Sequence, residues 1–143
     1  MANILKSFFI LTVFSLCINT NLKAQATAEE LMDAFFQIFE EDAGAAIDYL
    51  FATNNMIDPN QPGIKSIKER LELSRKLLGD YHGYEIINVY QAGESYRKYN
   101  YSLKFERQPV KFTVVLYCPK DKWKVQNVNF QDDIDTEFSL RED

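Results

Sequence analysis

The spacing of hydrophobic side chains changes once along this chain, from a helical period to a strand period at about Tyr84. Residues 27–52 carry apolar side chains three and four positions apart, which is typical of amphipathic helices. Thr27 and Glu30 match a capping box, in which each side chain accepts a hydrogen bond from the backbone amide of the other residue. The first helix is then predicted to bury one stripe of side chains: Leu31, Phe35, Ile38 and Phe39.

Two more helices are predicted before the period changes. Asp42 can cap the second helix, and Gly79 stands where the third helix ends. Residues 53–63 lie between these helices and are rich in asparagine, proline and glycine, which predicts an irregular surface loop. The apolar faces are Ala43, Ala46, Ile47, Leu50 and Phe51 in the second helix, and Ile64, Ile67, Leu71, Leu77 and Leu78 in the third.

From Tyr84 onwards the side chains alternate, and this alternation predicts four strands at residues 84–90, 96–106, 110–118 and 123–130. Short turns between successive strands make the neighbours antiparallel, so the strands form a meander. Three helices followed by a four-stranded antiparallel sheet form an α+β fold, in which the helices cover one face of the sheet.

The two faces of this sheet differ in chemistry. The face that we expect the helices to cover is aromatic and aliphatic: Tyr99, Tyr101, Leu103, Phe105, Phe112, Val114 and Leu116. The outer face carries Lys98, Asn100, Ser102 and Lys104 on the second strand. Val115 and Tyr117 also point outward, and Ile87 and Val89 join them if Tyr84 and Ile86 face the helices. These apolar residues predict a homodimer through the outer face.

The first 26 residues have the pattern of a secretory signal peptide. Lys6 precedes an apolar run of about 11 residues, and residues 24–26 read Ala-Gln-Ala, which suits a signal peptidase. The run is shorter than the roughly 20 residues of a membrane-spanning helix, so we expect no membrane insertion after cleavage. Leu16 stands before Cys17, where lipidation requires a small residue. The mature chain is predicted to begin at Thr27 and to be exported, to the periplasm or outside the cell.

Charge and cysteine content narrow the functions that fit. The whole chain has a formal net charge of −5, and removal of Lys6 and Lys23 with the leader makes it −7. Such a chain lacks the basic face that nucleic acid or anionic lipid requires. Cys118 is the single cysteine left after cleavage, so the domain has no internal disulfide and Cys118 is expected to be buried or half-buried. The acidic tail, residues 134–143, is expected to be solvated.

Two stretches resemble the nuclear transport factor 2-like superfamily. Residues 78–87, Leu-Gly-Asp-Tyr-His-Gly-Tyr-Glu-Ile-Ile, are similar to the glycine-punctuated entry from the long helix into the sheet, and residues 123–130, Trp-Lys-Val-Gln-Asn-Val-Asn-Phe, to the closing strand. The resemblance covers residues 27–133 and implies a cone-shaped half barrel with a pocket between the helices and the concave sheet. It does not imply one function, because this fold serves as enzyme, ligand binder and dimerisation module.

Candidate catalytic residues are few. Asp80 and His82 are the one place where an acid and an imidazole lie close in sequence, so Asp80 can orient His82 as a base. The alternative is that both are solvated turn residues between two glycines. Isomerases and dehydratases of the superfamily place an acid inside the cone, and here only Asp33 and Asp48 lie beside apolar helix faces. One histidine and one mature cysteine cannot form the usual zinc sites, so no metal or other cofactor is expected.

Two kinds of function remain open. In the first, the chain is a secreted, non-enzymatic binding or accessory domain for a small apolar ligand or a partner protein. For a ligand, Tyr99, Tyr101 and Trp123 would offer polar groups beside an apolar pocket. In the second, the chain is a proton-transfer enzyme of the isomerase or dehydratase type. An enclosed pocket would favour a ligand, and a filled interior would favour a partner protein.

Overall fold

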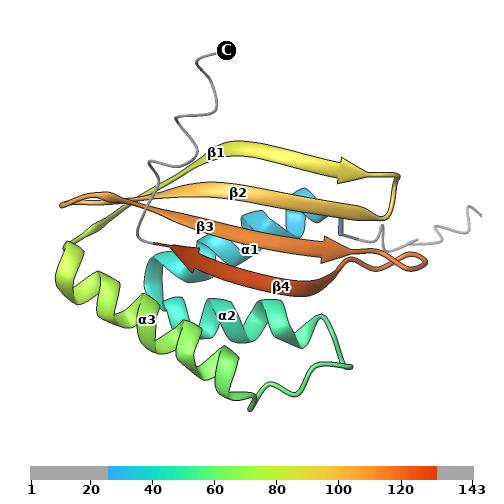
Figure 1. Ribbon diagram of the computed structural model, residues 1–143, viewed down its shortest axis with the longest axis horizontal. Coiled ribbons are helices and arrows are strands. Elements are labelled where there is room, and N and C mark those ends of the chain that lie inside the picture. Colours follow the sequence, from blue (N-terminus) through green and yellow to red (C-terminus); the bar gives the residue numbers. More distant parts are fainter. Residues whose placement is uncertain (1–25, 132–143) are drawn as a thin grey trace, which may run out of the picture.

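The computed structural model describes residues 26–131, and the predicted leader and acidic tail lie outside this range except for Ala26. Three helices and a four-stranded antiparallel sheet form an α+β fold (Figure 1). The elements are α1 (Ala28–Glu41), α2 (Ala43–Ala52), α3 (Pro62–Leu78), β1 (Tyr81–Ala92), β2 (Tyr96–Phe105), β3 (Pro109–Tyr117) and β4 (Lys124–Gln131). The strands lie in the order β1-β2-β3-β4, and the sheet is open, with β1 and β4 at its edges.

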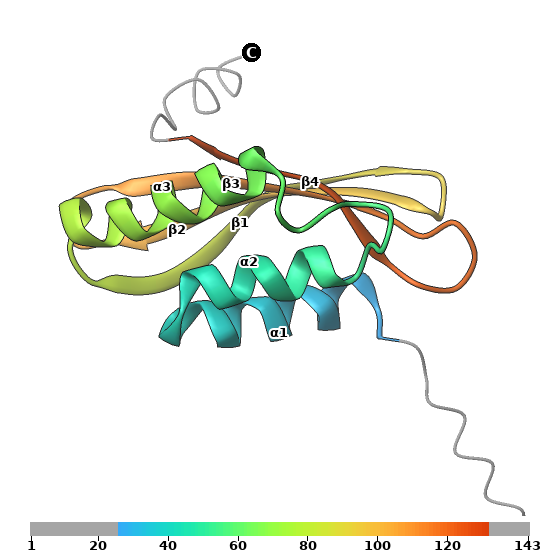
Figure 2. The same cartoon turned by 90° about the horizontal axis from the view of Figure 1, so that it is seen from below.

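The helices take two different positions on the sheet. Figure 2 shows α1 and α2 side by side on one face, while α3 lies along the β4 edge and packs against α2. The opposite face of the sheet carries no described helix. No helix within residues 26–131 is both long and apolar enough to cross a membrane.

The predicted helix caps are present. The Thr27 hydroxyl accepts from the Glu30 amide at 3.1 Å, and the Glu30 carboxylate accepts from the Thr27 amide at 2.8 Å. Asp42 accepts from the Ala45 amide at 2.8 Å and so begins α2. Gly79 ends α3 with a φ of 83°, which favours glycine, and an added Cβ there would lie 2.9 Å from the Cβ of Glu106.

The predicted apolar stripes form the core with one exception. The stripe residues of α1 and α2 are buried apart from the half-buried Ile38, and α1 also buries Met32 and Phe36. Leu77 of α3 was expected in the core and is instead 61% exposed. It lies one helical turn from the exposed Leu73, on a different side of α3 from the buried Leu71 and Leu78.

Polar side chains fasten the end of α2 to β4. The Thr53 hydroxyl accepts from the Val125 amide at 2.9 Å and donates to the Leu50 carbonyl at 2.6 Å. Asn54 is buried, and its side-chain amide donates to the Val125 carbonyl at 2.7 Å. Both residues belong to the predicted surface loop, so the first part of this loop is a structural junction.

The strand boundaries differ from the prediction at both ends of the sheet. β1 begins at Tyr81 and continues to Ala92, whereas the alternation pattern predicted a start at Tyr84. Register shifts at residues 81–84 and 86–88 interrupt the alternation in this strand, which is why its first residues were missed. Trp123 precedes β4, which begins at Lys124.

Candidate functional site

The structure places the predicted site residues at opposite ends of the helix–sheet interface. Tyr99 and Tyr101 lie on the helix-facing side of β2, towards the β1–β2 turn, and are both buried. Trp123 is half-buried just before β4, at the same end of the sheet. Asp80 and His82 lie at the other end, where α3 leads into β1.

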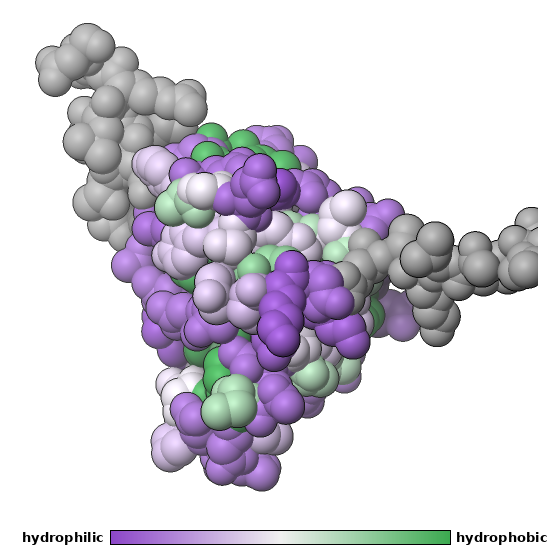
Figure 3. Space-filling model, turned by 90° about the vertical axis from the view of Figure 1, so that its right-hand side faces the viewer, coloured by the Kyte–Doolittle hydropathy of each residue, from purple (hydrophilic) through white to green (hydrophobic). Residues whose placement is uncertain are grey.

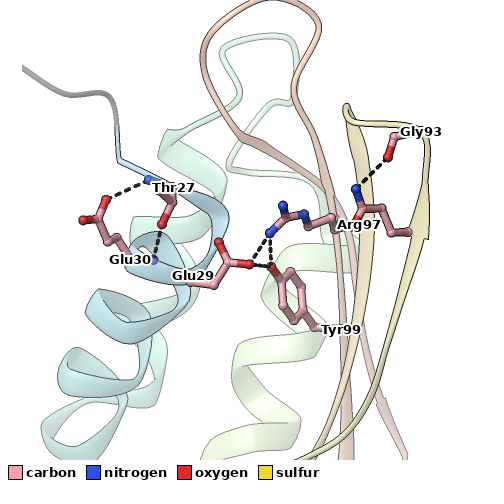
Figure 4. Close-up of polar contacts among 7 residues, drawn as sticks. Thr27, Glu29, Glu30, Gly93, Arg97 and Tyr99 are labelled. Carbon is pink, nitrogen blue, oxygen red and sulfur yellow. Dashed lines mark hydrogen bonds and ion pairs between the residues drawn. The ribbon is translucent and has the colours of Figure 1, made fainter.

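Glu29, Arg97 and Tyr99 form a hydrogen-bonded cluster at the first end (Figure 4). The Glu29 carboxylate accepts from the Tyr99 hydroxyl at 3.0 Å and forms an ion pair with Arg97. The Arg97 guanidinium also donates to the Tyr99 oxygen at 3.3 Å. The Thr27 and Glu30 capping box lies in the same turn of α1, so the helix start that the sequence predicts also positions Glu29.

Trp123 extends this cluster towards solvent. The Arg97 guanidinium carbon lies 5.1 Å from the centre of the Trp123 ring, within the range of a cation–π contact. The other side of Trp123 borders an open pocket of about 410 Å³. Its lining is mostly apolar: Ala26, Leu31, Ala52, Thr53, Lys122 and Trp123.

The electrostatics of the cluster follow from its contacts. Burial raises the pKa of Glu29, but hydrogen bonds from its own backbone amide and from Tyr99, together with the charge of Arg97, outweigh burial and lower it overall. Burial raises the pKa of the Tyr99 phenol; the hydrogen bond from Arg97 lowers this pKa in part, and the hydrogen bond to Glu29 raises it. The hydrogen bond to Tyr99 raises the pKa of Arg97. Glu29 and Arg97 are therefore a charged pair at neutral pH, and Tyr99 is a neutral donor.

His82 at the second end does not pair with Asp80 as the catalytic interpretation required. Its Nε2 lies 2.6 Å from the Glu106 carboxylate, and both side chains are more than half exposed. The alternative prediction, two solvated turn residues, is correct in that both side chains are exposed, but His82 belongs to β1 and not to a turn. An open pocket of about 450 Å³ lies here, lined by Glu40, Arg75, Gly79, Asp80, Tyr81 and His82.

The space between the helices and the sheet is filled with aromatic rings. Phe35 of α1 stacks on Phe112 of β3 with ring centres 5.3 Å apart, and Phe36 meets Tyr101 edge-to-face at 4.8 Å. Tyr101 is 2% exposed, and burial raises its pKa far above the usual value. Tyr101 is therefore a core residue with no surface for a ligand. The pockets described here lie at the rim of this core and open to solvent.

Acidic residues are absent from the buried part of residues 26–131. The buried polar residues in this range are Asn54, Ser74 and Asn100. Asp33 and Asp48 are exposed; the Tyr84 hydroxyl lies 3.5 Å from Asp33, and Asp48 pairs with Lys68. Within the described part of the chain, no group of three or more metal-ligating side chains comes together.

The outer face of the sheet carries a polar row and a group of tyrosines. The Asn100 amide donates to Asn88 at 2.6 Å, and its oxygen accepts from Thr113 at 2.7 Å, so one row links three strands. Asn100 is only 1% exposed, although it was predicted on the solvated face. Nearer the β1–β2 turn, three outward tyrosines are each more than a third exposed: Tyr90, Tyr96 and Tyr117.

One part of the predicted interface is wrong. Val89 lies opposite Tyr99, on the helix-facing side of the sheet, and not beside Val115. The register shift at Ile87 adds one residue to β1, which reverses the alternation after Ile86. Tyr90 takes the outward place that Val89 was expected to fill, opposite Lys98.

The sequence analysis missed Glu29 and Arg97. Both residues could have been recognised from the sequence. Arg97 lies two and four residues before Tyr99 and Tyr101, so it is on the same face of the strand, and Glu29 lies in the first turn of a capped helix. No protein-family model and no curated protein matches the chain.

Proposed function

We propose that this chain is an exported, non-enzymatic binding or accessory domain of the nuclear transport factor 2-like type. The observation that carries the proposal is the filled interior. Stacked rings occupy the position of a ligand cavity in a cone-shaped fold, and ligand recognition inside a domain requires a cavity of several hundred Å³. The binding site is then expected on the surface of the domain, and in this proposal a cone-like sheet would serve to seat the helices.

The outer face of the sheet is the surface that we assign to a second copy of this chain. Val115, Tyr96 and Tyr117 lie together near the β1–β2 turn, and Lys98 and Asn127 border them. Tyrosine is enriched at protein interfaces because it offers a large apolar ring and a polar tip. Figure 3 views the molecule onto this end, where hydrophilic side chains predominate and apolar ones are scattered. On the outer face itself, Val115 is the one aliphatic residue of this group, so the proposed interface has a small apolar content, which suits a reversible homodimer.

Light scattering of residues 27–143 at micromolar concentration tests this assignment. A dimer mass is expected, and Val115→Lys is expected to give the monomer mass because it places a charge in the centre of the interface. Leu73→Lys is the matched control, since Leu73 is 52% exposed on α3, away from the outer face. A wild-type monomer, or a dimer that Val115→Lys leaves intact, would exclude this interface.

A small apolar ligand is the second candidate, and the pocket beside Trp123 is the observation that favours it. Lys122 lies at the rim and can hold a carboxylate, while Leu31, Ala52 and Trp123 can contact a short alkyl chain. Octanoate is a suitable probe. Saturable change of the Trp123 fluorescence, abolished by Ala52→Arg, would support this site, and no change at millimolar octanoate would exclude it.

The enzyme alternative, a proton-transfer isomerase or dehydratase, has less support. It needs an acid or histidine in a closed site, and its four candidates, Asp33, Asp48, Asp80 and His82, are all at exposed positions. Titration of these four groups by NMR would reopen the alternative if one had a strongly shifted pKa.

The proposed export is tested by determining where the leader is cleaved. N-terminal sequencing of secreted protein is expected to start at Thr27, which is the N-cap residue of α1. A mature form that begins at a lipidated Cys17 would contradict the soluble, exported state.

A further inference from the structure

One edge of the sheet is covered by a helix, and the other edge is not. α3 lies along β4 and covers that edge (Figure 1), whereas no described strand or helix lies along the outer side of β1. β1 is also the longest strand, with 12 residues from Tyr81 to Ala92. A long uncovered edge presents backbone donors and acceptors to any strand that can pair with it.

β1 lacks the side chains that usually protect such an edge. Its sequence contains no lysine, arginine or proline, which are the common means of blocking edge-to-edge pairing. Ile86 and Val89 lie opposite Tyr101 and Tyr99, so both are on the helix-facing side of the sheet. They are nevertheless 57% and 44% exposed, because the helix layer does not extend over this edge. The edge therefore offers both backbone groups and apolar side chains.

The neighbouring helix is strongly acidic. α1 contains five acidic side chains and no basic one: Glu29, Glu30, Asp33, Glu40 and Glu41. Asp33 lies within 3.5 Å of the Tyr84 hydroxyl, so the acidic side of α1 borders the helix-facing side of β1. Glu29 is paired with Arg97, but within residues 26–131 neither Asp33 nor Glu40 forms an ion pair with a lysine or arginine. Basic side chains projecting from a strand added beside β1 would lie near this acidic helix.

We propose that the β1 edge binds an extended segment of a partner protein that carries basic and apolar residues together at every second position, on the side that faces the helices. The segment pairs with β1 through the backbone as a fifth strand. Its apolar side chains cover Ile86 and Val89, and its lysines or arginines face Asp33 and the acidic side of α1. This inference deepens the proposed binding function but uses a surface distinct from the outer face.

Charge decides between this partner and a second copy of the chain. Pairing of two β1 strands would join two edges that contain no lysine or arginine, so neither copy would offer a basic group to the acidic α1 of the other; Glu85 already pairs with Lys104 of β2. The two acidic α1 helices would also be drawn towards one another. A basic segment replaces this repulsion with attraction, and a net charge of −7 for the mature chain acts in the same direction.

Fluorescence anisotropy with a labelled ten-residue lysine–valine peptide tests the proposal. Lysine and valine take turns at every second position of this peptide and threonine fills the positions between them, so that the lysines and valines lie on one face. Saturable binding to residues 27–143 is expected, weakening as salt rises because charge attraction is screened. The same peptide with glutamate in place of each lysine is expected not to bind. A lysine–valine peptide with N-methylated alternate amides is expected to lose binding, since it cannot complete the ladder.

Variants locate the peptide on the protein. Ile86→Lys and Val89→Lys are each expected to weaken binding at least tenfold, and Asp33→Asn roughly threefold to fivefold. Leu77→Lys is the matched control because Leu77 is 61% exposed on α3, and it is expected to change nothing. Far-UV circular dichroism confirms that each variant is folded.

Three results would overturn the inference. They are no saturable binding at millimolar peptide, equal binding of the glutamate peptide or the N-methylated peptide, and binding that survives Ile86→Lys. A dimer that Ile86→Lys dissociates and Val115→Lys does not would instead assign the edge to a second copy. Failure of the outer-face dimer alone would leave peptide binding at β1 unaffected, so the two proposals fail separately.

Discussion

Replacing Phe112 with alanine removes the ring that joins the sheet to α1. Phe112 has no exposed surface, and its ring stacks on Phe35 with an interplanar angle of 4°. Burial of a phenylalanine contributes about 1.5–3 kcal/mol, and a stacked aromatic pair adds about 0.5–1.5 kcal/mol. With the cavity left among buried neighbours, the expected loss in the free energy of unfolding is about 4 kcal/mol. Domains of this size unfold with about 5–15 kcal/mol, so the loss is large.

Tyr117→Ala is the matched control on the same strand, and both variants are compared at a protein concentration at which light scattering gives the monomer mass. Tyr117 is 40% exposed on the outer face, opposite Tyr96, and loss of a cross-strand pair costs about 1 kcal/mol or less. Urea unfolding of both variants is followed by the fluorescence of Trp123, the single tryptophan, and by circular dichroism. A Phe112→Ala loss below about 1 kcal/mol, or equal losses for the two variants, would refute the assignment of the sheet faces and the filled interior.

Three further predictions concern polar groups. Asn100→Ala should lower the free energy of unfolding by about 1–3 kcal/mol, because Asn88 and Thr113 each lose a hydrogen-bond partner in a covered site. Ser102→Ala should change it by no more than about 0.5 kcal/mol, and similar urea midpoints for the two variants would contradict this prediction. Glu29→Gln should lower the free energy of unfolding at pH 7, because the lowered pKa of Glu29 means that the folded state is stabilised by the ionised carboxylate; this difference from wild type should disappear as the pH falls below the ordinary value of 4.5 and through the lowered pKa. A difference in thermal unfolding that does not depend on pH would argue against the charged pair. Asp42→Ala should cost about 0.5–2 kcal/mol through loss of the α2 cap, and Asp42→Asn should restore most of it in the same assay.

The sequence predicted the elements whose signals are local. Helix starts depend on a few neighbouring residues, and the caps at Thr27 and Asp42 are both present. The helix-facing side of β2 and β3 was predicted correctly, because strict alternation leaves one assignment that buries the aromatic residues.

The errors arose where a contact distant in sequence decides the outcome. The extra residue at Ile87 changes the side on which Val89 lies, and nothing in residues 84–90 marks the position of a bulge. His82 pairs with Glu106 across the sheet rather than with Asp80 two residues away. Asn100 looks like a surface residue until Asn88 and Thr113 enclose it.

The attachment of α2 to β4 has a consequence for the order of folding. Each strand pairs with its neighbour in sequence, so the sheet grows through short loop closures, each of which costs little entropy. The bonds from Thr53 and Asn54 to Val125 instead span 72 and 71 residues, and Arg70 reaches the carbonyl of Phe130 across 60. Contacts of such separation form late and slow the overall rate. The helices and the first three strands are therefore expected to form early, and the domain is expected to become resistant to proteases only once β4 has joined the sheet.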